Sequence, residues 1–163
     1  MPTDTWGKPI IRKLVNRIDH VAWICELANI EAHVAEMEAI FDIKLEHFCR
    51  SDMGIVVYYN MAAGIEVVAP LDERSDANRT FHERLETSGE GLMGVVFGVN
   101  DIDKHKARIE GIGQTLGPII DQSHSPWRDK VVLRQRMAPS LINTMIVLGQ
   151  NDYDEDMLHV EEV

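Results

Sequence analysis

The same order of sequence patterns occurs twice along this chain, and this internal repeat limits the possible folds more than any other feature. Residues 18–24 form a short apolar, β-branched run that is typical of a buried strand. Asn29 can then cap a helix whose apolar residues recur at helical spacing up to Phe41. Three more strand-like runs follow, at residues 45–50, 55–60 and 65–69, with Gly54 and Gly64 at the expected turns.

The second half repeats this order. Residues 92–99 predict a strand, and Asp101 is expected to cap a helix whose core-facing residues end at Ile112. Three strands are then predicted at residues 115–120, 130–136 and 144–148. Between the halves, residues 76–85 predict a short linker helix. Each half therefore has the order β-α-β-β-β.

This repeat predicts an α+β fold of two βαβββ modules that form a curved mixed sheet around a central cavity. One module alone would expose the apolar face of its sheet, so two must pack together. We expect an N-terminal extension at 1–17, a single domain at 18–150 and an acidic tail at 151–163. Within the domain, module one covers 18–70, the linker 71–91 and module two 92–150. The alternative is an α+β sandwich without internal duplication.

Composition excludes several classes of protein. The net charge of −11 disfavours binding to nucleic acid, whose phosphates require a basic surface. Six acids lie in the last thirteen residues, and without them the net charge is −5 (−11 plus 6). No apolar run is long enough to span a membrane, and no signal peptide is evident, so we expect a cytoplasmic protein. Cys25 and Cys49 are expected to be small buried apolar residues rather than a disulfide.

Specific strings resemble the vicinal-oxygen-chelate (glyoxalase/bleomycin-resistance/dioxygenase) superfamily, and methylmalonyl-CoA epimerases most of all. Asp19-His20-Val21-Ala22 is similar to the opening strand of that family. Glu66 to Leu71, Ser88 to Leu92 and Val99 to Ile102 are similar to three further epimerase segments. The resemblance covers residues 18–150 and implies a small-molecule enzyme of the lyase or isomerase type that acts as a homodimer.

The same resemblance implies a divalent metal held by one residue from each of four strands. Two of these positions fall on His20 and Glu66, which could be ligands. The other two fall on Gly94 and Val147, which have no donor side chain. We therefore expect no tightly held metal and no other cofactor, and the weak binding of a divalent metal is left open.

Three residues are candidates for catalysis: His20, Glu66 and Asp52. The resemblance places Asp52 at a proton-transfer base of the epimerases, whose second base corresponds to Val147. We expect His20 and Glu66 to lie side by side on the cavity face, since a strand alternates its faces. The pair is either a general base that works without metal or a structural ion pair.

Four residues are candidates for ligand binding. His124 and Trp127 lie on a loop expected at the rim of the cavity, and such loops often contact ligands. Arg134 and Arg136 have the same strand parity and so face the same way. If that face lines the cavity, they favour an anionic substrate. Otherwise they form ion pairs with the acidic surface.

Three functions follow from these features. The expected one is a glyoxalase-fold enzyme of the lyase or isomerase type that acts on a small molecule in the cavity. The alternative is a metal-free protein that binds or sequesters a small molecule. A third is a dimeric partner-binding protein with vestigial site residues. Because the second-half acid is absent, we expect little or no methylmalonyl-CoA epimerisation.

Overall fold

The computed structural model describes residues 17–125, 128 and 131–153. Trp127 and nearly all of the predicted acidic tail lie outside the described residues. Module one is built from the following elements: β1 (Arg17–Ile24), η1 (Leu27–Asn29), α1 (Ile30–Phe41), β2 (Glu46–Arg50), β3 (Ile55–Asn60) and β4 (Ile65–Pro70). The linker helix is α2 (Arg79–Ser88). Module two is built from β5 (Gly91–Gly98), α3 (Ile102–Gly111), β6 (Val131–Leu141) and β7 (Thr144–Tyr153).

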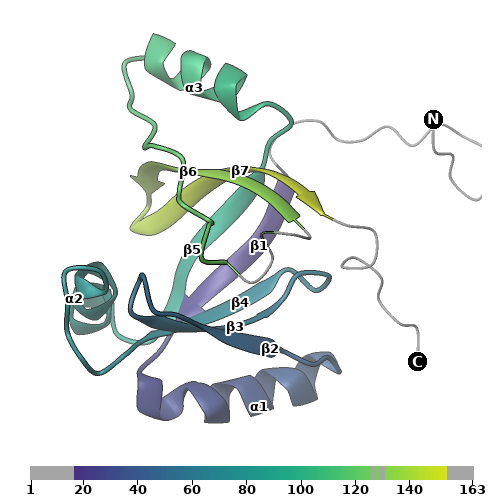
Figure 1. Ribbon diagram of the computed structural model, residues 1–163, viewed down its shortest axis with the longest axis vertical. Coiled ribbons are helices and arrows are strands. Elements are labelled where there is room, and N and C mark those ends of the chain that lie inside the picture. Colours follow the sequence, from purple (N-terminus) through teal and green to yellow (C-terminus); the bar gives the residue numbers. More distant parts are fainter. Residues whose placement is uncertain (1–16, 126–127, 129–130, 154–163) are drawn as a thin grey trace, which may run out of the picture.

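In the part of the chain that the structure describes, the strands form one mixed, curved, seven-stranded sheet in the order β2-β3-β4-β1-β5-β7-β6 (Figure 1). Strand β1 pairs parallel with β4, and β5 pairs parallel with β7. The two modules join through the antiparallel pair β1 and β5 at the centre of the sheet. The α+β fold predicted from the repeat is therefore confirmed.

Module two differs from the prediction in one strand. Residues 115–120 do not form a strand, and their one ladder contact is the isolated bridge between Ile119 and Arg136. Gly117 and Pro118 interrupt this segment, and proline has no N–H to donate to a neighbouring strand. Two backbone hydrogen bonds, from Gly117 N and Ile120 N to β6, still hold the segment against the sheet. Strand β7 instead extends beyond its predicted end, to Tyr153.

The alternation of side chains along the strands of module one divides its core into two layers. Trp23, Ile65 and Val67 pack toward the face that α1 covers. Ala22, Ile24, Ile55, Val57 and Val68 belong to a separate cluster on the opposite face, with Leu85 of α2. Helix α3 packs over a third cluster in module two, built around Ile102 and Leu148. The layer that contacts α2 is the layer that opens into the cavity.

Two helix starts test the predicted caps. The Asp101 side chain accepts hydrogen bonds from the backbone N–H groups of Asp103 and Lys104, as expected of a cap. Asn29 makes no side-chain cap. Its amide instead donates to Glu90, whose same oxygen also accepts from the backbone N–H of Glu26. A residue of the linker therefore secures the start of module one's helix.

Several residues predicted to be buried lie at the surface. Phe41 is 51% exposed because α1 ends there, at a left-handed Asp42. Ile112 follows the end of α3 and is 66% exposed. Cys49 is exposed, whereas Cys25 is buried as expected. None of the helices in the described ranges is long and apolar enough to cross a membrane.

Candidate functional site

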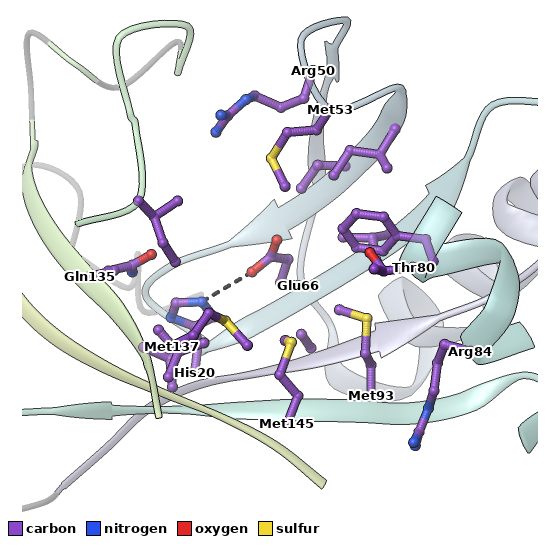
Figure 2. Close-up of a pocket in the computed structure, with 18 of the residues that line it drawn as sticks. His20, Arg50, Met53, Glu66, Thr80, Arg84, Met93, Gln135, Met137 and Met145 are labelled. Carbon is purple, nitrogen blue, oxygen red and sulfur yellow. Dashed lines mark ion pairs between the residues drawn. The ribbon is translucent and has the colours of Figure 1, made fainter. Parts of the chain in front are cut away.

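A cavity of about 650 Å³ opens on the concave face of the sheet. Its walls come from both modules, the linker helix α2 and the segment before β6 (Figure 2). Most of its lining side chains are apolar, and five of the eight methionines in the chain are among them. Its titratable lining side chains are His20, Arg50, Glu66 and Arg84.

His20 and Glu66 are in contact on the wall of this cavity, as expected. Strand β4 pairs with β1 so that Glu66 lies opposite Ala22, one step along the same face from His20. The distance from His20 Nε2 to Glu66 Oε2 is 3.0 Å, drawn as a dashed line in Figure 2. The His20 side chain is 5% exposed and that of Glu66 is 22% exposed. Glu66 is thus the member of the pair that faces the open space.

Asp19 holds the other side of the imidazole, and the sequence interpretation missed this partner. The His20 Nδ1 atom lies 2.9 Å from Asp19 Oδ1, and the Asp19 side chain is 4% exposed. Strand β1 changes register against β5 between Ile18 and His20, at Asp19 itself. Such an irregularity can redirect a side chain that simple alternation would place on the far face.

The charge of His20 follows from this arrangement. Each ring nitrogen lies within hydrogen-bond distance of a carboxylate, which cannot donate when it is ionised, so both nitrogens donate. Burial opposes a charged ring, but the hydrogen bonds that the ring donates to Asp19 and Glu66, together with the charges of these carboxylates, outweigh it and raise the pKa of His20 from 6.5 to about 9. His20 is therefore an imidazolium at neutral pH. It cannot accept a proton in that state, so Glu66 is the available base of the pair.

A chain of side-chain amides from module two reaches this cluster from the far end of the cavity. Arg50 Nη1 donates to Gln122 Oε1 at 3.3 Å, and Gln122 Nε2 donates to Gln135 Oε1 at 3.3 Å. Gln135 Nε2 donates to Asn151 Oδ1 at 3.4 Å. Asn151 Nδ2 donates to Asp19 Oδ1 at 3.1 Å. This amide chain therefore joins a guanidinium to a carboxylate.

Its two ends fix the direction of the amide chain. Arg50 can only donate, so the amide oxygen of Gln122 must face it. An ionised Asp19 can only accept, so the amide nitrogen of Asn151 must face that carboxylate. The amides between them then have one orientation that satisfies every contact. The amide chain thus holds Asp19 in place as a hydrogen-bond acceptor for His20.

The second-half positions implied for a metal do not supply ligands. Strand β5 places Gly94 opposite Ala22, on the cavity face. A Cβ at Gly94 would lie 2.8 Å from the Met145 carbonyl oxygen and 2.9 Å from the Met145 Cε, so Met145 fills that space. Val147 is buried and lines the cavity. The two remaining positions, His20 and Glu66, form an ion pair with each other.

No group of three or more His, Cys, Asp or Glu side chains in the described ranges could hold a metal ion. The donors present therefore do not fit a four-ligand centre of the kind that the resemblance implies.

Asp52, which the resemblance places at a proton-transfer base, is not among the residues that line the cavity. Both of its oxygens accept from Arg50, at 2.9 Å from Nε and 2.8 Å from Nη2. The Arg50 guanidinium lowers the pKa of this carboxyl. A more acidic carboxyl is a weaker base, and its geometry makes it the counter-ion of a buried arginine.

The predicted ligand-binding residues are also placed elsewhere. His124 is exposed and does not line the cavity, and Trp127 lies outside the described residues. Arg134 pairs with Asp103 of α3 at 3.1 Å, and Arg136 donates to the Gly117 carbonyl at 2.9 Å. These two arginines share a face, as predicted, but it is the face opposite to Gln135 and Met137, which line the cavity. The loop reaches the cavity through Ile120 and Gln122 instead.

Arg84 is a lining residue that the sequence interpretation did not consider. It lies on α2, and its Nη1 and Nη2 donate to the carbonyl oxygens of Asn143 (3.1 Å) and Leu92 (3.0 Å). Its Nε is buried without a hydrogen-bond partner in the described part of the chain. In Figure 2 its guanidinium is directed away from His20 and Glu66. The helical spacing in the linker gave no signal that α2 would form a cavity wall.

Among the comparisons with known proteins, the one with solved structures identifies the fold. Neither a protein-family model nor a curated protein matches the chain. Among solved structures, a variant of the Streptomyces coelicolor methylmalonyl-CoA epimerase in complex with 2-nitronate-propionyl-CoA has 19% identity and a TM-score of 0.60, over 83% of this chain and 94% of that one. The Mycobacterium tuberculosis methylmalonyl-CoA epimerase has 17% identity and a TM-score of 0.62, over 86% and 91%.

A third methylmalonyl-CoA epimerase structure has 22% identity and a TM-score of 0.60, over 81% of this chain and 92% of that one. At these identities the likeness is one of fold, and it extends over nearly the whole length of each neighbour. The chain therefore has the vicinal-oxygen-chelate fold, and methylmalonyl-CoA epimerases are among its structural neighbours.

Proposed function

We propose that this protein is a small-molecule enzyme of the isomerase or lyase type that moves a proton in the cavity without a tightly held metal. The observation that carries the proposal is the buried cluster of Asp19, His20 and Glu66 on the cavity wall. We also propose that it works in the cytoplasm. We further propose that it is a homodimer, and sedimentation analysis of the purified protein would test that oligomeric state.

Glu66 is the proposed base. Its Oε2 accepts a hydrogen bond from His20, and its Oε1 has no hydrogen-bond partner in the described part of the chain. In the proposed step, Glu66 takes a proton from a carbon next to a carbonyl group, and the electron pair of the C–H bond passes into the enolate. Return of the proton to a different atom of the enolate system completes an isomerisation. In an elimination, the electron pair of the enolate expels a leaving group from the neighbouring carbon, and the proton on Glu66 passes to that leaving group or to water. The His20 imidazolium, held by Asp19, orients Glu66 as a positioning residue.

The test is deuterium incorporation from D₂O into carbonyl compounds with an acidic α-hydrogen, followed by mass spectrometry. The probes are a 2-oxo acid, a 3-oxo ester, an acyl thioester and methylmalonyl-CoA. We expect exchange with at least one uncharged probe, and little with methylmalonyl-CoA. Glu66→Gln should slow the exchange by about 100-fold or more, since general-base catalysis contributes on that order.

Glu83→Gln provides the matched control, because Glu83 is exposed on α2 and does not line the cavity. This variant should exchange at the wild-type rate. Equal exchange by the wild type and the Glu66→Gln variant would rule out Glu66 as the base.

A metal-free binding protein is the second candidate, and the apolar, methionine-rich wall of the cavity favours it. Such a wall suits a bound ligand whether or not a reaction follows. The same experiment separates the two candidates, because a binding protein would retain a ligand but give no exchange above the uncatalysed rate with any probe.

A further inference from the structure

The wall of the cavity around the proton-transfer cluster is apolar and adaptable. Five methionines line it, each from a separate strand or turn: Met53, Met61, Met93, Met137 and Met145. Methionine has no branch and a polarizable sulfur, so it packs against apolar ligands of varied shape. The aromatic rings of Phe48 and Phe81 complete this wall. A ligand that fills the space must therefore present mainly apolar surface.

The charges near Glu66 disfavour an anionic group at that end of the ligand. Asp19 and Glu66 carry two negative charges and His20 carries one positive charge, so this cluster has a net charge of about −1. A carboxylate placed beside Glu66 would be repelled in surroundings that screen charge poorly. Neutralising it would need a metal or an unpaired cation close by.

Neither cationic side chain of the cavity supplies that neutralisation. The charge of Arg50 is already matched by a bidentate contact with Asp52. Arg84 has no carboxylate partner in the described part of the chain, but it is held by two backbone carbonyls and is directed away from Glu66 (Figure 2). An anion bound at Arg84 would lie away from the reacting end. The reacting end itself is lined by the His20–Glu66 pair, apolar side chains and the uncharged amide of Gln135, so no unpaired cation lies there in the described part of the chain.

We propose that the ligand of this cavity is a molecule with an apolar body that is uncharged at the end reaching Glu66. This inference deepens the proposed function, since it names the substrate class of the same site. A neutral ketone, enone or ester with a hydrocarbon or aromatic body fits this class. A small dicarboxylate does not fit it.

Two fluorescent probes with the same skeleton test the charge preference. N-phenyl-1-naphthylamine is neutral, and 1-anilinonaphthalene-8-sulfonate adds one sulfonate to the same rings. Fluorescence titration of the full-length protein should show one binding site for the neutral probe. The sulfonated probe should bind about tenfold more weakly or worse, because its added charge meets a net negative cluster in a poorly screened site. Equal or tighter binding of the sulfonated probe overturns the proposal.

Two variants locate the binding in the cavity. Ala77 is exposed and lines the cavity, so Ala77→Trp should block the opening and weaken the neutral probe by about tenfold without disturbing the core. Glu66→Gln removes the negative charge, so the affinities of the two probes should approach each other, while Glu83→Gln leaves them unchanged. Binding that neither cavity variant alters overturns the proposal.

These measurements read binding rather than turnover, so they separate this proposal from the proposed function. Tight neutral-probe binding without deuterium exchange would contradict the enzyme and leave the ligand class standing. Deuterium exchange confined to the probes that carry a carboxylate would support the proposed enzymatic function and overturn the proposal of an uncharged, apolar ligand.

Discussion

The two modules share most of their topology, although module two has one strand fewer, and they differ in chemistry at matching positions. Module one places His20 on its first strand and Glu66 on its last, and both reach the cavity. At the matching positions module two has Gly94 and Val147. Strand pairing is nearly the same in both, with the first and last strands of each module parallel. The two modules therefore share the pairing of their first and last strands, while their side chains at the site differ.

Module two nevertheless serves the site in two other ways. Gln122, Gln135 and Asn151 form the amide chain that reaches Asp19, and Met137 and Met145 form apolar wall. The comparison suggests that the reacting groups belong to module one, and that module two supplies their support and the surface around the ligand. The predictions below test this division.

The largest expected effect is the loss of stability when the His20 cation of module one is removed. His20→Ala should lower the free energy of unfolding by about 3 to 5 kcal/mol, because it leaves the buried carboxylate of Asp19 and the partly buried one of Glu66 without the cation that both contact. Urea denaturation measures this loss. His33→Ala is the matched control, since His33 pairs with Glu90 at a half-exposed site and should cost less than about 1 kcal/mol. Similar losses in both variants would contradict a charged, buried His20.

Stability should also depend on pH through His20. Its pKa is raised from 6.5 to about 9 on folding, so its protonated form favours the folded state. The contribution is fully present below about pH 6.5 and is lost as pH rises to about 9. It amounts to about 3 kcal/mol from a shift of this size. Unfolding measured between pH 6 and pH 9.5 should show the decline, and His20→Gln should flatten it.

The support from module two should be measurable at Asn151. Asn151→Leu removes the donor that ends the amide chain at Asp19, and should cost about 1 to 3 kcal/mol of unfolding free energy. Gln114→Leu, at an exposed position, should change stability by less than about 0.5 kcal/mol. Nuclear magnetic resonance of the His20 ring in Asn151→Leu should show a lower pKa. An unchanged ring signal would mean that the amide chain does not act on His20.

Packing at Gly94 provides a further test of the difference between the two modules. Gly94→Ala brings a Cβ to 2.8 Å from the Met145 carbonyl and should cost about 1 to 3 kcal/mol through overpacking. Gly111→Ala is the control, because a Cβ there meets nothing within 4 Å. It should be neutral, or stabilising by up to about 1 kcal/mol, since alanine favours a helix. Thermal unfolding of the two variants, compared side by side, decides the point.

The smallest expected effect is that of divalent metal on the stability of the protein. With two of the implied donors replaced by Gly94 and Val147, purified protein should hold well below one equivalent of Co, Mn, Ni or Zn after gel filtration. Added divalent metal should leave the melting temperature nearly unchanged, because weak binding stabilises little. Mass spectrometry measures this metal content. A content near one equivalent would contradict the view that module two supplies only support and apolar wall to the site.

The sequence allowed the fold and the His20–Glu66 contact to be predicted. Strand alternation indicated which face of its strand each side chain occupies, and the resemblance to the epimerases implied that the first and last strands of the module bring the two side chains together. Residues 115–120 were predicted to be a strand from the repeated order of elements. Gly117 and Pro118 interrupt that strand, because proline has no N–H to donate to a neighbouring strand.

The rest of the site depends on tertiary geometry that no local pattern encodes. Asp19 reaches His20 through a register shift in β1, whereas alternation predicts the far face. Asn151 fell within the predicted tail, yet it ends the amide chain. Asp52 matched a family position, but its oxygens bind Arg50, which lies only two residues away. Parity alone could have suggested Gln135, a polar residue between two outward-facing arginines.

The contact between Gly94 and Met145 limits how a metal site could be engineered into this cavity. A histidine at position 94 would need the backbone of β7 to move, because the obstacle includes a carbonyl oxygen as well as a flexible side chain. Adding one ligand there is therefore costly until the neighbouring strand has also changed, and position 147 would still lack a donor side chain. A four-ligand site would need several coordinated substitutions whose first steps reduce stability. A new substrate for Glu66 would need none of these changes in β7, so the cavity is more easily redesigned around its carboxylate than around a metal ion.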